Sequence, residues 1–320
     1  MKILITGGTG FIGSVLTTEL LNKGVEVFTL SRHIPAVSMK GVNRMRGDVL
    51  EPNLGIYDPT LHFDCVYHLA GIHTLKTEDN DGAIWNTNVN GTHNVLKYCA
   101  EHNVKHLYFT STAYAWSANP YGRSKMLNDL EVENFCRASG IKYTIFKPSV
   151  VMGNAGHPYP GHFSQFMAAV IKVHQRAEII RQKIEGTLRL PVIEPAFRVR
   201  GNPQGKLNLV PIDQVVKGIC EIDKEGIVWL TNPNPPTLEE LADWAGEYMM
   251  LNFKIMPEFK AMPLEALFAQ KAAAFIPYME GDNFPSDLPE CPKITKEFIQ
   301  ETVKALVSMH GTKNGSAADV

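Results

Sequence analysis

The chain opens with Met1-Lys-Ile-Leu-Ile-Thr-Gly-Gly-Thr-Gly-Phe-Ile-Gly-Ser14, and this stretch decides the fold. Ile3–Ile5 is a short apolar run typical of a buried strand, and Thr6–Gly13 reads T-G-x-x-G-x-x-G. An apolar pattern of helical period begins at Phe11, and a second apolar run follows at 25–30. A strand, a glycine-rich turn, a helix and another strand in this order predict a phosphate-binding unit.

Each glycine of this turn has a predicted role. Gly7 allows the tight turn, Gly10 lets a pyrophosphate approach the backbone, and Gly13 lets the helix pack closely on the strand. Free N–H groups at the start of the helix would hold the phosphates. The alternative is a glycine-rich turn without a ligand, which the flanking strand and helix patterns disfavour.

Composition narrows the class of protein. The 320 residues carry a formal net charge of −2, so charge does not favour a nucleic-acid partner. No apolar run is long enough to span a membrane. Because Met1 leads directly into a predicted strand, we expect no secretory signal. We expect a cytoplasmic protein with reduced thiols and no metal site, since His102 and His106 lack suitable ligand spacing. The cysteines show no framework spacing; they are Cys65, Cys99, Cys136, Cys220 and Cys291.

Strand and helix patterns alternate through the first half of the chain. They predict an α/β fold with a doubly wound parallel sheet, helices on both faces, and the ligand at the carboxyl edge of the strands. We expect a dinucleotide-binding domain formed by 1–153 and about 207–232, including a strand at 207–213 that returns to the main sheet. A smaller substrate-binding lobe would comprise about 154–206 and 233–308, followed by a disordered tail at 309–320. In the lobe, Thr237 and Glu240 form a predicted capping box.

The end of the second strand predicts which cofactor binds. An NAD enzyme places Asp or Glu there to bind the ribose 2′-hydroxyl, but this chain has Thr29-Leu-Ser-Arg-His33. Ser31 and Arg32 suit a 2′-phosphate, with Arg as a planar donor. We therefore expect NADP(H), with NAD(H) as the alternative if Arg32 is only a solvated surface residue.

The motifs, in their order, resemble those of the extended short-chain dehydrogenase/reductases, the epimerase/dehydratase-like group. The resemblance runs from Met1 to about Met309, and it implies a Rossmann-type fold with cofactor contacts along the first half. The matching motifs are Thr6–Gly13, Asp48-Val49, His68-Leu-Ala-Gly71, Asn88-Val-Asn-Gly-Thr92, Phe109-Thr-Ser-Thr-Ala113, Tyr121-Gly-Arg-Ser-Lys125 and Lys147-Pro-Ser-Val-Val-Met-Gly153. The implied cofactor-binding residues are Gly7, Thr9, Gly10, Phe11, Ile12, Gly13, Ser31, Arg32, Asp48, Val49, Leu69, Ala70, Gly71, Tyr121, Lys125, Pro148 and Val150.

Tyr121 and Lys125 carry the predicted chemistry. Residues four apart lie on one face of a helix, and an ammonium beside a phenol lowers the phenol's pKa. Lowering the pKa of tyrosine from ~10 to ~7 requires the phenolate to be stabilised by roughly 4 kcal/mol relative to the phenol. Tyr121 would then be the general acid in carbonyl reduction or the base in alcohol oxidation. By the resemblance, Thr112 orients the substrate oxygen, with Ser111 as the alternative, and Asn88 supports the lysine.

Three functions remain open. The first is an NADP(H)-dependent oxidoreductase acting on a carbonyl or alcohol, with acyl thioesters among its candidate substrates. Ser111-Thr-Ala-Tyr114 and Leu207-Asn-Leu-Val-Pro-Ile-Asp213 resemble stretches of fatty acyl and thioester reductases. The alternatives are a nucleotide-sugar epimerase with retained cofactor and a non-catalytic dinucleotide-sensing protein. Ala113-Tyr114 replace the Asp-Glu pair of nucleotide-sugar dehydratases, which disfavours that chemistry.

The expected partners are a small-molecule substrate and a second copy of the chain. Extended members of the resembled family often pair through two long helices, here Gly82–His102 and Pro120–Ala138. Apolar residues such as Leu127, Leu130 and Phe135 would be left over after these helices pack on the sheet. The alternative is that all three face the sheet.

Overall fold

A computed structural model describes residues 1–34, 39–153, 161–188 and 196–311. It divides the chain into two compact units. Unit 1 comprises Met1–Ser149, Ile212–Thr231 and Phe284–Glu290, and unit 2 comprises Val150–Pro211, Asn232–Asn283 and Cys291–Val320. Among the described residues, no helix is both long and apolar enough to cross a membrane.

Unit 1 is built on a seven-stranded parallel sheet with the order β10-β6-β5-β4-β1-β2-β3. Its first strand is buried on both faces, as the apolar run Ile3–Ile5 predicts for a strand covered by helices on both sides. The strands are β1 Lys2–Thr6, β2 Glu26–Ser31, β3 Asn43–Arg46, β4 Cys65–His68, β5 His106–Thr110, β6 Lys142–Pro148 and β10 Gly226–Leu230. This arrangement confirms the predicted doubly wound α/β class.

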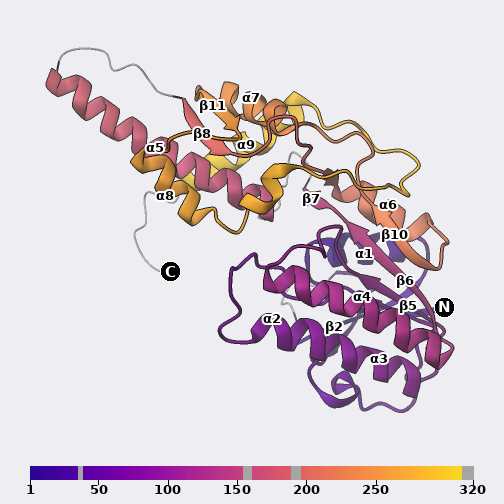
Figure 1. Cartoon of the computed structure of the whole chain (residues 1–320). Coiled ribbons are helices and arrows are strands. Elements are labelled where there is room, and N and C mark those ends of the chain that lie inside the picture. The colour runs from indigo at the N-terminus through magenta and orange to yellow at the C-terminus, as the bar shows by residue number, and fades with distance from the viewer. Residues whose placement is uncertain (35–38, 154–160, 189–195, 312–320) are drawn as a thin grey trace. The chain divides into compact units, whose positions relative to one another are not determined.

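Helices cover both faces of this sheet. Figure 1 shows α3 and α4 side by side on one face, and α1 packs with α6 on the other. The helices are α1 Phe11–Asn22, α2 Ala83–Trp85, α3 Gly91–Glu101, α4 Pro120–Ser139 and α6 Ile212–Glu221, with a short 3-10 turn, η1, at Pro52–Gly55. The expected long helix at 82–102 contains a π turn, η2, at Asn86–Asn90 between α2 and α3. Because π turns are often found at functional sites, this interruption directs attention to Asn88.

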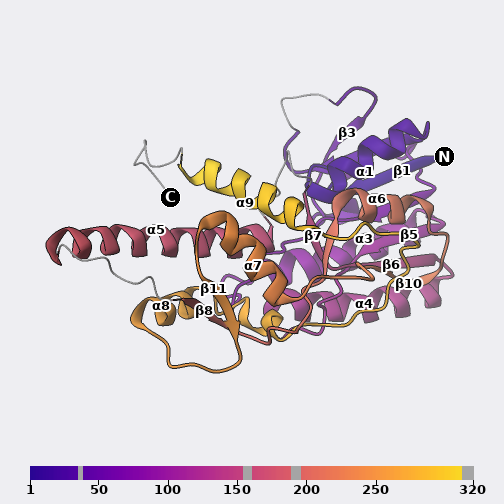
Figure 2. The ribbon, with the colours of Figure 1, turned by 90° about the horizontal axis from the view of Figure 1, so that it is seen from above.

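Unit 2 has its own apolar core. Phe268 lies at its centre, with edge-to-face ring contacts to Phe166 and Phe197. Figure 2 shows its helices together with the strands β8 and β11. The elements are β7 Val150–Met152, α5 His162–Leu188, β8 Phe197–Arg200, β9 Leu209–Pro211, α7 Leu238–Met249, β11 Phe253–Met256, α8 Pro263–Lys271, η3 Ile276–Glu280 and α9 Lys296–Gly311.

Two sequence expectations for the second half are wrong. The strand predicted at 207–213 does not join the main sheet, because β9 pairs with β7 in a separate two-stranded sheet. The disordered tail expected at 309–320 is contradicted for 309–311, because α9 continues to Gly311, and 312–320 lie outside the described residues. Both errors concern pairing or packing with distant segments, which a local apolar pattern does not encode.

The capping box at the start of α7 is confirmed and gives a stability prediction. Thr237 Oγ1 accepts a hydrogen bond from Glu240 N at 3.1 Å, and Glu240 Oε2 accepts one from Thr237 N at 2.8 Å. Thr237→Ala should lower the free energy of unfolding by about 1 kcal/mol, because a helix N–H loses its acceptor. Urea unfolding followed by circular dichroism measures this change. Thr187→Ala, which removes a threonine near the end of α5, is the control, and equal losses in both variants would contradict the assignment.

Candidate active site

The glycine turn after β1 has the close contacts that its sequence predicts. Gly7 has a φ of +75°, and a Cβ there would lie 2.6 Å from Ala70 N. A Cβ on Gly13 would collide with Gly7 O. Larger residues at these two positions would push the helix and the neighbouring loop away from β1, so the turn keeps its shape only with glycine.

The start of α1 fits a phosphate group. Gly10 is its N-cap in an extended conformation, and within the described residues no side chain caps the helix and no acid lies in its first turn. The first turn of a helix leaves its N–H groups without helical acceptors. The predicted contacts Phe11, Ile12 and Gly13 form this turn, and Thr9 is exposed beside it. This uncapped helix start offers N–H donors of the kind that bind phosphate groups.

Two cations lie at the end of β2, where the sequence predicts a contact with a ribose phosphate. Ser31 Oγ donates to His33 O at 2.9 Å, and Arg32 is exposed. The β2–β3 register places Arg46 beside Ser31, a second cation that sequence reasoning missed because it required strand pairing. Asp48 Oδ1 accepts a hydrogen bond from Leu50 N at 3.0 Å, while the buried Val49 packs against Gly91.

In the loop after β4, the predicted residue Gly71 lies close to two others, Asn88 and Lys125. Leu69 N donates to Thr6 O at 3.0 Å, which holds Leu69 and Ala70 against β1. A Cβ on Gly71 would lie 3.1 Å from Asn88 Oδ1 and 3.6 Å from Lys125 Nζ. The amide of Asn88 and the ammonium of Lys125 therefore face the same short stretch of backbone.

Asn88 is buried rather than directed to solvent. Its Oδ1 accepts from Ile72 N at 2.8 Å, and its Nδ2 donates to Ile72 O at 3.0 Å. Nδ2 also donates to Ser124 Oγ at 2.9 Å, and Ser124 Oγ donates to Tyr121 O at 2.7 Å. Asn88 thus connects the loop after β4 to the first turn of α4.

Lys125 holds its charge in a buried position at the start of α4. Only 5% of the residue is exposed, and Nζ donates to Thr110 O at 2.8 Å and lies 4.7 Å from the centre of the Phe109 ring. Burial lowers the pKa of Lys125 to about 8, while the nearby Asp129 carboxylate acts in the opposite direction. Tyr121, four residues earlier, is half-buried on the same helical face.

The two hydroxyls at the end of β5 have different surroundings. Thr112 Oγ1 accepts from Tyr114 N at 3.2 Å and lies 3.5 Å from Pro148 O. Ser111 Oγ is buried and makes no hydrogen bond with the described residues.

Val150, the last predicted cofactor contact, begins β7 in unit 2.

A buried polar network behind these residues was missed by sequence reasoning. Thr92 Oγ1 donates to Asn88 O at 2.6 Å, so its contact with His68 Nε2, at 3.0 Å, has the imidazole N–H as donor. His68 Nδ1 then accepts from Thr6 Oγ1 at 2.7 Å. Asn128 Nδ2 donates to Asn88 O at 3.0 Å. The position of Asn128, three residues after Lys125 on the same helical face, is a signal that could have identified it.

His68 is neutral in this network. Burial lowers its pKa to about 3, with the Lys125 ammonium as a second cause. A neutral imidazole with one donor and one acceptor matches Thr92 on one side and Thr6 on the other. It therefore acts as a rigid connection between β1 and the π turn at Asn88.

Comparison with known proteins supports the resemblance seen in the motifs. A family model described as the NAD dependent epimerase/dehydratase family matches residues 3–189, more than half of the chain. The matched region includes the glycine turn, the Asn88 turn and the Tyr121–Lys125 pair.

The curated relatives match over less than half of the chain. The 2-alkyl-3-oxoalkanoate reductase of Stenotrophomonas maltophilia (strain K279a) is 34% identical over 113 residues, which cover 35% of this chain and 33% of that protein. The UDP-glucose 4-epimerase of Halalkalibacterium halodurans is 32% identical over 170 residues, which cover 46% of this chain and 50% of that protein. The chain therefore spans between a third and a half of the length of these two relatives.

A solved structure shows a similar fold over nearly the whole chain. The terminal R domain of the myxalamid PKS-NRPS biosynthetic pathway aligns with a TM-score of 0.67 and 17% sequence identity. The alignment covers 97% of this chain and 91% of that domain. At this identity the likeness concerns the fold alone.

The neutral state of His68 predicts a pH dependence of stability. Its folded-state pKa is depressed, so its contribution is fully present above the unfolded-state value near 6.5 and is lost as pH falls toward about 3. When the unfolded chain binds one more proton than the folded chain, the free energy of unfolding falls by about 1.4 kcal/mol for each unit by which the pH is lowered. His68→Gln should therefore show a shallower loss of unfolding free energy between pH 6.5 and 4 in urea titrations. His62→Gln, at an exposed position, should keep the wild-type slope, and identical slopes in the two variants would contradict the assignment.

Proposed function

The chain belongs to the NAD dependent epimerase/dehydratase family, and from that premise we propose that it is an NADP(H)-dependent oxidoreductase. Its reaction is hydride transfer to or from a carbonyl or alcohol carbon, with a tyrosine as the general acid or base. The observation that carries the proposal is the buried Lys125 ammonium, one helical turn after Tyr121 and beside the amide of Asn88. A buried charge has a desolvation cost, and we infer that Lys125 is buried because its charge stabilises the phenolate of Tyr121.

The residues of unit 1 have separate roles in this mechanism. When bound, the nicotinamide cofactor supplies or accepts the hydride. Tyr121 donates its phenolic proton to the substrate oxygen in reduction, and the Lys125 ammonium stabilises the phenolate that remains. Thr112 orients the substrate oxygen, and Asn88 keeps the loop after β4 in place beside the lysine. Ser111 is the alternative orienting hydroxyl, because its buried Oγ has no partner among the described residues.

We propose a carbonyl compound of acyl type as substrate. The support is the relative named 2-alkyl-3-oxoalkanoate reductase, which shares 34% identity over the matched stretch. The absence of an Asp-Glu pair after Thr112 agrees with reduction rather than dehydration. The proposal includes a cytoplasmic location, which rests on five free cysteines.

A nucleotide-sugar epimerase is the second candidate, favoured by the relatives named UDP-glucose 4-epimerase. An epimerase must keep its dinucleotide through turnover, whereas a reductase exchanges it. The absorbance of the purified protein near 340 nm, measured again after denaturation, shows whether dinucleotide is retained, and so separates the two candidates. A non-catalytic dinucleotide sensor is the third candidate, and dinucleotide binding without turnover of any aldehyde, ketone or acyl thioester would favour it.

The end of β2 predicts a preference for NADP(H). Arg32→Ala should weaken NADPH binding by about 1.5–3 kcal/mol, the range for a hydrogen bond to a charged group, and should leave NADH binding nearly unchanged. Arg46→Ala should weaken NADPH binding in the same direction, since Arg46 lies beside Ser31. Calorimetric titration of both cofactors provides the measurement, with Lys23→Ala at the end of α1 as the control. Equal or tighter NADH binding by the wild type would refute the preference.

The exposed face of α4 predicts a homodimer. Leu127 and Leu130 are 38% and 56% exposed, so they lack cover in unit 1. Phe135 does not belong to this surface, because it packs against the core of unit 1. Light scattering at micromolar concentration should give the mass of a dimer, and Leu127→Glu with Leu130→Glu should give a monomer. A monomeric wild type would end this proposal.

Turnover should depend on the hydroxyl of Tyr121. Tyr121→Phe should lower kcat by about 10²–10⁴, the contribution of general acid catalysis, while cofactor binding persists. Lys125→Met should lower kcat similarly and also weaken cofactor binding, and Thr112→Ala should cost less. The assay follows NADPH oxidation with aldehydes, ketones and acyl thioesters, and Tyr57→Phe, at an exposed position, is the control. A Tyr121→Phe variant as fast as the wild type would show that another group is the acid.

A further inference from the structure

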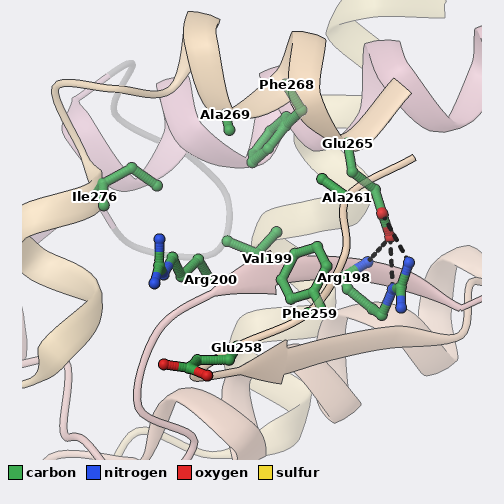
Figure 3. A pocket seen from close by; sticks show the side chains of 10 residues that line it. All are labelled: Arg198, Val199, Arg200, Glu258, Phe259, Ala261, Glu265, Phe268, Ala269 and Ile276. Carbon is green, nitrogen blue, oxygen red and sulfur yellow. Dashed lines mark hydrogen bonds and ion pairs between the residues drawn. The ribbon is translucent and has the colours of Figure 1, made fainter. Parts of the chain in front are cut away.

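Unit 2 contains a cavity of about 620 Å³ between strand β8 and the segment 258–276. Figure 3 shows its lining, which combines charged side chains with an apolar wall. Every residue of this lining belongs to unit 2. The volume lies within the range of small-molecule binding sites.

A buried ion pair holds one side of the cavity. Glu265 Oε1 accepts from Arg198 Nε at 2.9 Å and Oε2 accepts from Arg198 Nη2 at 3.0 Å, with the Glu265 side chain only 2% exposed. The same carboxylate accepts from Arg198 N and from Met262 N at the start of α8. It therefore fixes α8 to β8, and the charge of Arg198 is already balanced. The cavity is preorganised, which reduces the entropic cost of binding a ligand.

Arg200 supplies the cation that remains available. Its Nε donates to Pro257 O at 3.2 Å, which fixes the direction of the guanidinium. Its two terminal amino groups make no hydrogen bond or ion pair within the described parts of the chain. In Figure 3, Arg200 lies beside Ile276, on the side of the cavity opposite to the Arg198–Glu265 pair. A guanidinium held in this way presents two parallel donors to a planar carboxylate.

The other lining residues determine which apolar part and which charge of a ligand the cavity can accommodate. Val199, Phe268, Ala269 and Ile276 provide an apolar wall next to Arg200. Glu258 is the other acid of the lining besides the paired Glu265, so the lining as a whole has no surplus of positive charge. A dianion such as a phosphate monoester would be repelled by Glu258 more strongly than a monoanion.

We propose that this cavity binds a small monocarboxylate with an apolar chain or ring. The carboxylate accepts hydrogen bonds from the terminal amino groups of Arg200, and the apolar part lies along Val199, Phe268 and Ile276. The site is independent of the proposed hydride transfer, because binding involves residues of unit 2 alone and requires neither cofactor nor turnover. Failure of one proposal therefore leaves the other unaffected.

Calorimetric titration of the full chain with octanoate, 1-octanol and octyl phosphate tests the ligand class. Octanoate should bind saturably with one site per chain. Both the alcohol and the phosphate monoester should bind at least about 10-fold more weakly, since each loses or opposes the charge match at Arg200. Absence of saturable octanoate binding, or equal binding of octanol, overturns the proposal.

Two variants locate the site. Arg200→Gln, at an exposed position, should weaken octanoate binding by about 10-fold or more and remove its advantage over octanol. Ala269→Phe should abolish binding of both by filling the cavity. Lys254→Gln on β11 removes an exposed cation that does not line the cavity, and it should bind like the wild type. Equal effects of Arg200→Gln and Lys254→Gln, or full binding by Ala269→Phe in a folded protein, would place octanoate elsewhere and overturn the assignment.

Discussion

A continuous chain of buried polar side chains joins the first strand to the helix that carries Tyr121 and Lys125. It runs from Thr6 through His68 and Thr92 to Asn88, and then through Ser124 to the carbonyl of Tyr121. Each buried polar atom in such a chain needs its partner, because an unpaired one costs about 1–3 kcal/mol. The glycine turn and the start of α4 are therefore positioned by one network, and neither can shift without breaking it.

The Lys125 ammonium is the charge that this network surrounds. Its desolvation is offset by Thr110 O, by the face of the Phe109 ring and by the carboxylate of Asp129. Asp129 is itself shared, since it pairs with the half-buried Lys147 at 2.6 Å. Lys125 thus remains a cation near neutral pH, although its pKa is lowered to about 8. Such a group is suited to stabilise negative charge that develops on a neighbour.

Unit 2 uses a similar device for a different purpose. There a single carboxylate, Glu265, accepts from the side chain and backbone of Arg198 and from the first turn of α8. Breaking such a pair by removing one partner would leave a buried charge uncompensated, at a cost of about 3–5 kcal/mol. The pair therefore gives β8 and α8 a fixed spacing, and the cavity lined by Arg200 depends on that spacing.

The sequence by itself determined the features that are local along the chain. The strand, turn and helix at Met1–Ser14, the Tyr121–Lys125 spacing and the capping box at Thr237 each depend on residues within one or two turns of each other, so their patterns are readable. Only the tertiary structure decided that β9 pairs with β7, that Arg46 lies beside Ser31, that Lys125 is buried, and that His68 donates to Thr92. Those outcomes depend on contacts between segments tens of residues apart, and on burial, which sets both the free energy of a charge and the hydrogen bonds open to it.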